Sequence, residues 1–203
     1  AHGDFACRDY RLFERFDHAV QYHEVVYQMG NSSYHRFIYE TLQRRGGVVT
    51  LHDFALAGFQ YWMGQQADTP GDYFERELAY CYPQWVESYR SAEHDWAGEE
   101  GGLIRACVRR GIYLNRRVLE NSSRIVLHDR WGQDELRKRN PEYICKSAVV
   151  PHGAEVYEAS REDQIRVREQ FGLPPEALLF GCFGILSSTK MCVEVIEAFH
   201  ELT

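Results

Sequence analysis

Short apolar runs alternate with longer helix-patterned segments along the first 150 residues of the chain. The runs are rich in β-branched residues and fall at 25–27, 48–51, 125–128 and 148–150. Runs of this length and composition predict parallel strands that are covered on both faces. The segments at 10–23, 32–46, 104–119 and 131–138 predict helices. The alternation predicts an α/β fold with a doubly wound, Rossmann-like parallel sheet flanked by helices.

Residues 54–113 have a helical and aromatic pattern that is interrupted at 69–71 and 93–102. The aromatic run Phe54, Phe59, Tyr61 and Trp62 is interpreted as core packing, with an acceptor groove or a membrane contact as the alternatives. The arginine pairs at 109–110 and 116–117 are interpreted as solvated helix faces.

The last fifty residues predict the beginning of a second α/β unit. Ser160 and Asp163 form a capping pair for a helix that ends near Gly172. An apolar run at 178–183 predicts a strand, and the segment after 190 predicts a helix. We therefore expect one domain at 1–153 and an incomplete second unit at 154–203. We expect the final helix to pack its apolar face against a sheet. This face consists of Cys192, Val195, Ile196, Phe199 and Leu202.

The composition is that of a globular chain without an export or membrane signal. Its 203 residues are 44% hydrophobic, which is enough to bury a sizeable core. The net charge of −7, from 30 acidic and 23 basic residues, argues against nucleic acid as a partner. No apolar run reaches the roughly 18 residues of a spanning helix, and the six cysteines include no CxxC pair. We expect a cytoplasmic protein with reduced thiols.

Polar residues follow the ends of the predicted strands. His52 and Asp53 follow the run at 48–51, His128 ends the run at 125–128, and Gly30 with Asn31 follows the first run. Ligands of open α/β sheets bind at the carboxyl ends of the strands, so these residues are candidates for a binding site. For His52, a structural histidine bonded to a backbone carbonyl is an equal alternative on geometry alone.

A second candidate site lies at the turn before the last helix. Gly184 follows the predicted strand, and Lys190 stands at the start of the helix. A helix N-terminus favours an anion, and a lysine is electrostatically misplaced there unless it meets one, so the pattern predicts a phosphate site. Local spacing predicts no metal site, because His18 and His23 are five residues apart and miss the face that i,i+4 ligands share.

Five stretches in this order and spacing resemble the retaining, nucleotide-sugar-dependent glycosyltransferases of family 4, which have the GT-B fold. They are 27–31 with 33–35, 48–53, 118–128 with Trp131, 149–153 and 183–190, and they run through nearly the whole chain. The family's opening strand with its glycine-rich turn and its glutamate pair are absent, and Ile185 stands where an arginine is usual. The resemblance thus implies a fragment with most of the N-terminal domain and the start of the C-terminal domain.

The resemblance implies transfer of a sugar, with retention, from a nucleoside diphosphate sugar to a hydroxyl of a glycan or lipid-linked acceptor, without a cofactor or metal. His52 would face the transferred sugar and Lys190 the diphosphate, as the catalytic residues. The other partners expected are the remainder of the C-terminal domain and, peripherally, the cytoplasmic membrane. Donor or acceptor contacts are implied for Gly30, Asn31, His35, Asp53, His128, Pro151, His152, Gly153 and Gly184.

Two other functions stay open at this stage. A nucleotide-sugar epimerase can use the same fold, and a glutamate pair after residue 203 would favour the transferase. The chain can instead be a non-catalytic binding or complementing half, whose last helix would need a partner chain. Because the donor-side unit stops after one predicted strand and one predicted helix, we expect the isolated chain to be inactive.

Overall fold

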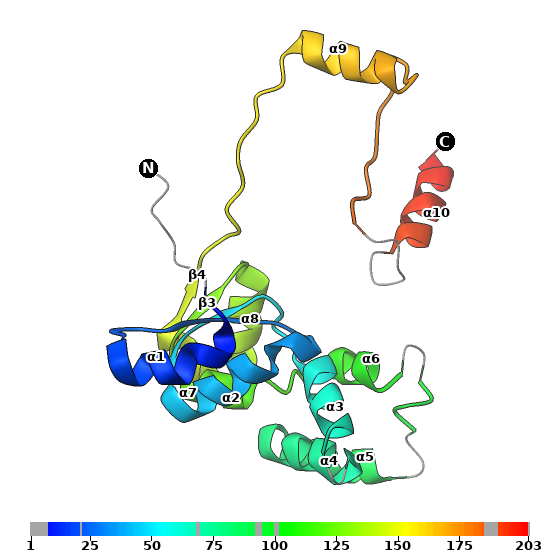
Figure 1. The fold of residues 1–203 in the computed structure, drawn as a ribbon. Coiled ribbons are helices and arrows are strands. Elements are labelled where there is room, and N and C mark those ends of the chain that lie inside the picture. The colour runs from blue at the N-terminus through cyan, green and yellow to red at the C-terminus, as the bar shows by residue number, and fades with distance from the viewer. Residues whose placement is uncertain are drawn as a thin grey trace. The chain divides into compact units, whose positions relative to one another are not determined.

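The computed structural model describes residues 8–20, 22–67, 70–91, 95–99, 102–184 and 191–202. The chain divides into two compact units, Ala1–Gly153 and Ala154–Thr203. Figure 1 shows the first unit as a sheet with helices packed around it. The predicted phosphate loop at 185–190, and Lys190 with it, lies outside the described residues.

The first unit is built on a four-stranded sheet in which all strands are parallel (Figure 1). The strands are β1 (Val26–Met29), β2 (Gly47–Leu51), β3 (Ser122–Leu127) and β4 (Ser147–Val149), and they lie side by side in chain order. The predicted parallel α/β sheet is therefore confirmed. A doubly wound sheet reverses its strand order at one point, and the four described strands contain no such reversal.

Helix α2 connects β1 to β2, α8 connects β3 to β4, and the long connection between β2 and β3 holds five α-helices among its described residues. The α-helices of this unit are α1 (Phe13–Val20), α2 (Arg36–Arg45), α3 (Ala57–Gln65), α4 (Pro70–Cys81), α5 (Val86–Arg90), α6 (Gly102–Arg109), α7 (Arg116–Asn121) and α8 (Arg130–Arg139). Short 3₁₀ helices are η1 (Tyr10–Leu12), η2 (Ser33–His35), η3 (Pro83–Trp85) and η4 (Pro141–Lys146).

The segment at 104–119 forms two helices, so the prediction of one continuous helix is wrong. Gly111 has a φ of +68° and donates its N–H to the carbonyl of Val108, which closes the end of α6. Glycine at this position is a common helix C-terminus. Leu114 then has a φ of +52°, and α7 starts two residues later. The apolar residues keep a helical spacing across this break, because α6 and α7 both bury an apolar face within the first unit.

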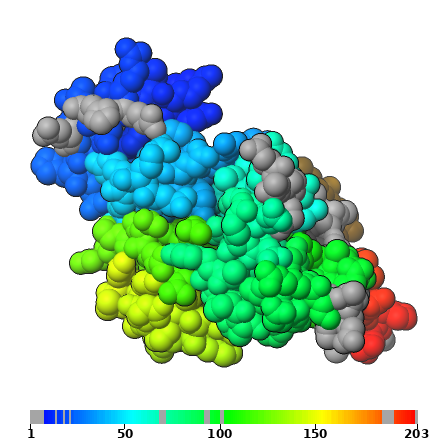
Figure 2. Space-filling model, turned by 90° about the horizontal axis from the view of Figure 1, so that it is seen from below, coloured from blue at the N-terminus to red at the C-terminus, as the bar shows by residue number. Residues whose placement is uncertain are grey.

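Two hydrophobic clusters fill the first unit. One packs against the sheet and includes Phe54 and Phe59, so their interpretation as core residues is confirmed, whereas Tyr61 is 41% exposed. The other cluster, with Phe74 and Trp96 among its largest members, lies among α3, α4, α5 and α6. Figure 2 shows these helices, in cyan-green to green, packed closely beside the yellow-green segments around α7 and α8.

An ion pair joins two helices of the long connection. Nε of Arg117 in α7 lies 2.9 Å and 2.8 Å from the two carboxylate oxygens of Glu77 in α4. Glu77 is only 6% exposed. The interpretation of residues 116–117 as a solvated face is therefore wrong for Arg117, because its charge neutralises a buried carboxylate.

The second unit, described by itself, contains α9 (Arg161–Gln170) and α10 (Cys192–Leu202). Ser160 caps α9 as predicted, with its hydroxyl accepting the N–H of Asp163 at 3.0 Å. The strand predicted at 178–183 is not formed, because a strand needs a paired neighbour and these residues have none in the described chain. Phe180 instead packs edge to face against Phe199 of α10.

Candidate functional site

The four strands end at one level, and this brings residues from distant parts of the chain to one edge of the sheet. Met29 pairs with Leu51, Leu51 with Leu127, and Leu127 with Val149. The residues that follow these four strand ends are Gly30, His52, His128 and Val150. The carboxyl edge of a parallel sheet is where open α/β proteins bind ligands.

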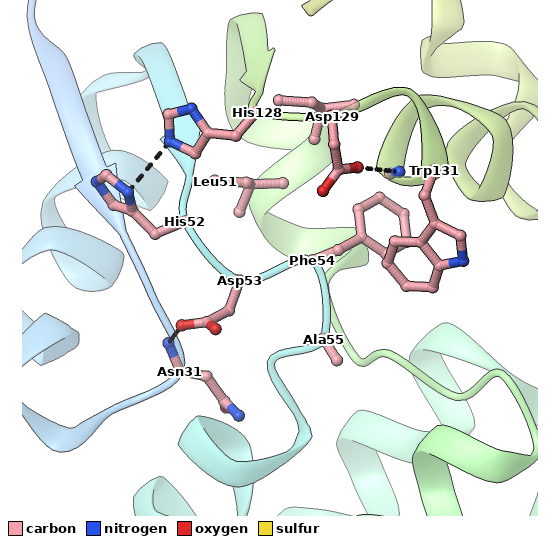
Figure 3. Close-up of a pocket in the computed structure, with 11 residues that line it drawn as sticks. Asn31, Leu51, His52, Asp53, Phe54, Ala55, His128, Asp129 and Trp131 are labelled. Atoms are coloured by element: carbon pink, nitrogen blue, oxygen red, sulfur yellow. Dashed lines mark hydrogen bonds between the residues drawn. The ribbon is translucent and has the colours of Figure 1, made fainter. Parts of the chain in front are cut away.

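A pocket of about 290 Å³ lies at this edge, between the loop after β2 and the beginning of α8 (Figure 3). Leu51, Leu127 and Phe54 give it an apolar lining, and Trp131 packs edge to face on Phe54 at 5.9 Å. Trp131 is 55% exposed, so part of its indole is open to a ligand. The polar lining residues are Asn31, His52, Asp53, His128 and Asp129.

Three histidines form a cluster beside the pocket. Nδ1 of His52 lies 3.2 Å from Nε2 of His128, and Figure 3 shows the two rings pointing toward each other. The ring of His152, in the loop after β4, stacks on His128 with 3.6 Å between centroids. Outside the cluster, Nε2 of His52 contacts Oε1 of Gln28 at 2.7 Å, and Nδ1 of His128 contacts the carbonyl of Val150 at 3.0 Å.

The surroundings of His52 favour its neutral form. Partial burial is the main cause that lowers the pKa of its imidazole, and the neighbouring His128, His152 and His35 lower it further, against an opposing effect of Asp53. A neutral imidazole has one nitrogen that donates and one that accepts. Both ring nitrogens of His52 already have partners, so a hydroxyl in the pocket would bind His52 in place of its contact with Gln28 or with His128.

Asn31, Asp53 and Asp129 line the pocket, but their polar groups hold the loops in place. Oδ2 of Asp53 accepts the backbone N–H of Asn31 at 2.8 Å, and Oδ1 of Asn31 accepts the backbone N–H of Phe59 at 2.7 Å. Asp129 caps α8 by accepting the N–H of Gly132 at 2.7 Å. These three residues position the loops, and the imidazoles face the pocket edge.

Gly30 allows two polar residues to approach the end of β1. A Cβ at this position would lie 2.9 Å from Cε1 of His35 and 3.1 Å from Oδ2 of Asp53, closer than side chains normally pack. His35 ends η2, and its Nδ1 contacts the hydroxyl of Ser32 at 2.9 Å. Glycine at this position lets the side chains of His35 and Asp53 approach the backbone, and the expected contact of Gly30 with donor or acceptor stays a prediction.

The remaining predicted contacts lie elsewhere. Pro151 and Gly153 are exposed in the loop after β4, next to the clustered His152. Gly184 belongs to the second unit and has a φ of +121°. Since Lys190 lies outside the described residues, the phosphate site stays a prediction.

Gln28 and Trp131 belong to the site, and the sequence analysis did not select either as a site residue. Gln28 is a polar residue in β1, one position before the strand ends, and Trp131 stands in the first turn of α8. Both follow a general signal: a polar side chain near a strand's carboxyl end, and a large aromatic in the first turn of the next helix.

Comparisons with protein-family models, curated proteins and solved structures return no match to this chain. Of the helices in the described part of the chain, none combines the length and apolar character needed to cross a bilayer. The fold and site define an α/β protein with a Rossmann-like parallel sheet and a histidine-edged pocket at its carboxyl end.

Proposed function

We propose that this chain is the acceptor-side part of a retaining glycosyltransferase with the GT-B fold, together with the start of its nucleotide-sugar domain. The enzyme would transfer a sugar from a nucleoside diphosphate sugar to a hydroxyl of a glycan or lipid-linked acceptor. The five stretches that resemble family 4 support this proposal, and three of them, 27–31 with 33–35, 48–53 and 118–128 with Trp131, contribute to the lining of one pocket.

The observation that carries the proposal is the position of His52. It follows β2, which has a strand on each side, and its exposed imidazole stands at the pocket edge opposite the exposed indole of Trp131. A sugar has hydroxyls that need hydrogen-bond partners and a C–H face that packs well on an aromatic ring. An imidazole and an indole on one small pocket are suited to both needs.

The proposed roles follow from the charges that develop during transfer. When the bond between the sugar and the diphosphate breaks, negative charge grows on the phosphates and the sugar gains oxocarbenium character. Lys190 would stabilise the departing diphosphate, and His52 would hold a hydroxyl of the transferred sugar so that its anomeric carbon faces the acceptor. The acceptor oxygen forms the new bond to the anomeric carbon on the face from which the diphosphate departs, and its proton passes to the departing diphosphate.

The test uses the full-length protein that contains this chain, with a panel of nucleoside diphosphate sugars and candidate acceptors. We expect release of nucleoside diphosphate that depends on both substrates, together with a glycosylated acceptor seen by mass spectrometry. Conversion of the donor into an isomeric nucleotide sugar would instead identify an epimerase. Binding of a nucleotide sugar without either product would identify a non-catalytic binding protein, and each of these two results contradicts the proposal.

A further inference from the structure

The three clustered histidines come from three different loops and offer their nitrogens to one point. His52 follows β2, His128 follows β3 and His152 follows β4. One ring nitrogen from each lies within 4.8 Å of the other two. Imidazole nitrogen is a common ligand of zinc, copper, iron and nickel in proteins.

The hydrogen bonds around the cluster leave two lone pairs facing each other. A carbonyl oxygen only accepts, so Nδ1 of His128 donates to Val150, and in a neutral imidazole Nε2 then holds a lone pair. With the Gln28 amide oriented so that Oε1 faces the ring, Nε2 of His52 donates to it, and in a neutral imidazole Nδ1 then holds a lone pair. These two unprotonated nitrogens are 3.2 Å apart, and two acceptors do not attract each other without a positive group between them.

The distance between the two nitrogens matches a shared metal ion. Zinc binds imidazole nitrogen at about 2.0–2.1 Å in tetrahedral geometry, which places two such nitrogens roughly 3.3 Å apart. The observed separation is 3.2 Å. The exposed ring of His152 stacks on His128, and one of its nitrogens lies within 4.8 Å of a nitrogen of each of the other two histidines, so a shared ion requires this ring to turn about its side-chain bonds.

We propose that His52, His128 and His152 bind a divalent transition metal, Zn²⁺ by preference, with a fourth position open toward the pocket. Gln28 and the Val150 carbonyl act as outer partners, because each fixes the proton on the ring nitrogen that faces away from the metal. This inference does not depend on the proposed transfer reaction. A metal on these nitrogens would compete with a sugar hydroxyl for His52.

Two metal-free arrangements also pair the facing nitrogens. The Gln28 amide can be turned over, so that its NH₂ donates to His52 and Nδ1–H of His52 donates to His128. Alternatively, one proton can be shared between the two rings. Neither arrangement requires a metal, so a test of binding separates them from the proposal.

The test is calorimetric titration of the untagged 203-residue chain with Zn²⁺. The thiols of Cys182 and Cys192 are 3.4 Å apart in the second unit and can bind zinc themselves, so all variants carry Cys182→Ser and Cys192→Ser. We expect one metal ion per chain and a rise in melting temperature with added Zn²⁺. His52→Ala, His128→Ala and His152→Ala should each weaken binding at least about tenfold. His23→Ala, an exposed histidine outside the cluster, should not.

Gln28→Glu distinguishes the metal from the turned amide. A carboxylate accepts more strongly than an amide oxygen from Nε2 of His52, which makes the imidazole a better ligand, so zinc affinity should increase. In the turned arrangement the amide of Gln28 is the donor, so Gln28→Glu would remove that donor and disturb the hydrogen bonds between the histidines without changing the zinc affinity. The proposal is overturned if the chain shows no saturable zinc binding, or if the three histidine variants bind zinc as the parent does while circular dichroism shows that they are folded.

Discussion

At the scale of single residues, Asn31 ties the pocket to the helical part of the first unit. Its backbone N–H is bonded to Asp53 and its side-chain oxygen to the backbone N–H of Phe59, in the first turn of α3. Leu56, the residue at the N-cap position of α3, has no side-chain oxygen with which to cap the helix. Asn31, in the loop after β1, therefore supplies the cap that α3 lacks.

Asn31→Ala should lower the free energy of unfolding by about 1 kcal/mol, because an N–H in the first turn of α3 loses its partner. Urea denaturation followed by circular dichroism measures this change. Asn31→Asp is the matched control, since it keeps an acceptor oxygen at this position, and it should recover most of the loss. If the alanine variant is as stable as the parent, the side chain of Asn31 does not stabilise α3, and this structural role is contradicted.

The sequence indicated that Asn31 and Asp53 belong to the site region but not what they bond to. Their partners are 22 and 28 residues away along the chain, and such pairings depend on how the loops fold over the sheet. Ser160 is different, because its partner is three residues away and the cap could be predicted from local spacing.

At the scale of elements, the strands were more predictable than the helices between them. Each of the four strands contains or adjoins a short apolar run, and these runs identified them, but β1 alternates exposed and buried positions and β4 has no fully buried residue, so the expected cover on both faces is wrong for these two strands. The long connection between β2 and β3 builds a second cluster from large aromatic side chains on short helices. Short helices have too few turns to show a clear helical periodicity in the sequence. The break after α6 depends on the positive φ of Gly111, and the spacing of the apolar residues gives no sign of it.

The helices of this connection are joined by the ion pair between Glu77 and Arg117. Because Glu77 is buried, Arg117→Ala leaves a carboxylate without a counter-charge and should lower the free energy of unfolding by about 3 kcal/mol. The control is Arg36→Ala, which removes an exposed i,i+4 pair with Glu40 and should cost under about 0.5 kcal/mol. Chemical denaturation of both variants measures the two changes, and similar small values would show that Glu77 is not dependent on Arg117.

At the scale of the whole molecule, the site exists because parallel strands end together. The sequence placed His52 and His128 separately at strand ends and His152 only among the contacts that the resemblance implied, and parallel topology implied a common edge for the strand ends. That the three rings come within reach of one ion was not predictable, since metal spacing was sought within single helices and these histidines come from three loops. Strand order and register are needed to bring them together.

In the second unit, a local apolar pattern predicted a strand that does not form. The apolar residues at 178–180 and on α10 form a groove lined by Leu178, Phe180, Ile196 and Phe199, and no described strand pairs with residues 178–183. A β-strand is stabilised by its neighbours, so its composition alone does not form it.

The most direct test of the proposed sugar site is a paired measurement on His52→Ala in the full-length protein. Turnover is followed by release of nucleoside diphosphate in the presence of a metal chelator, so that zinc does not contribute, and the melting temperature is measured on the same sample. Because the His52 side chain is exposed, its loss leaves no polar group sealed from water. We predict that kcat falls at least about tenfold while the melting temperature stays within a few degrees of the parent. Unchanged kcat, or a loss of activity that only follows early unfolding, would contradict the account and make His52 a structural residue.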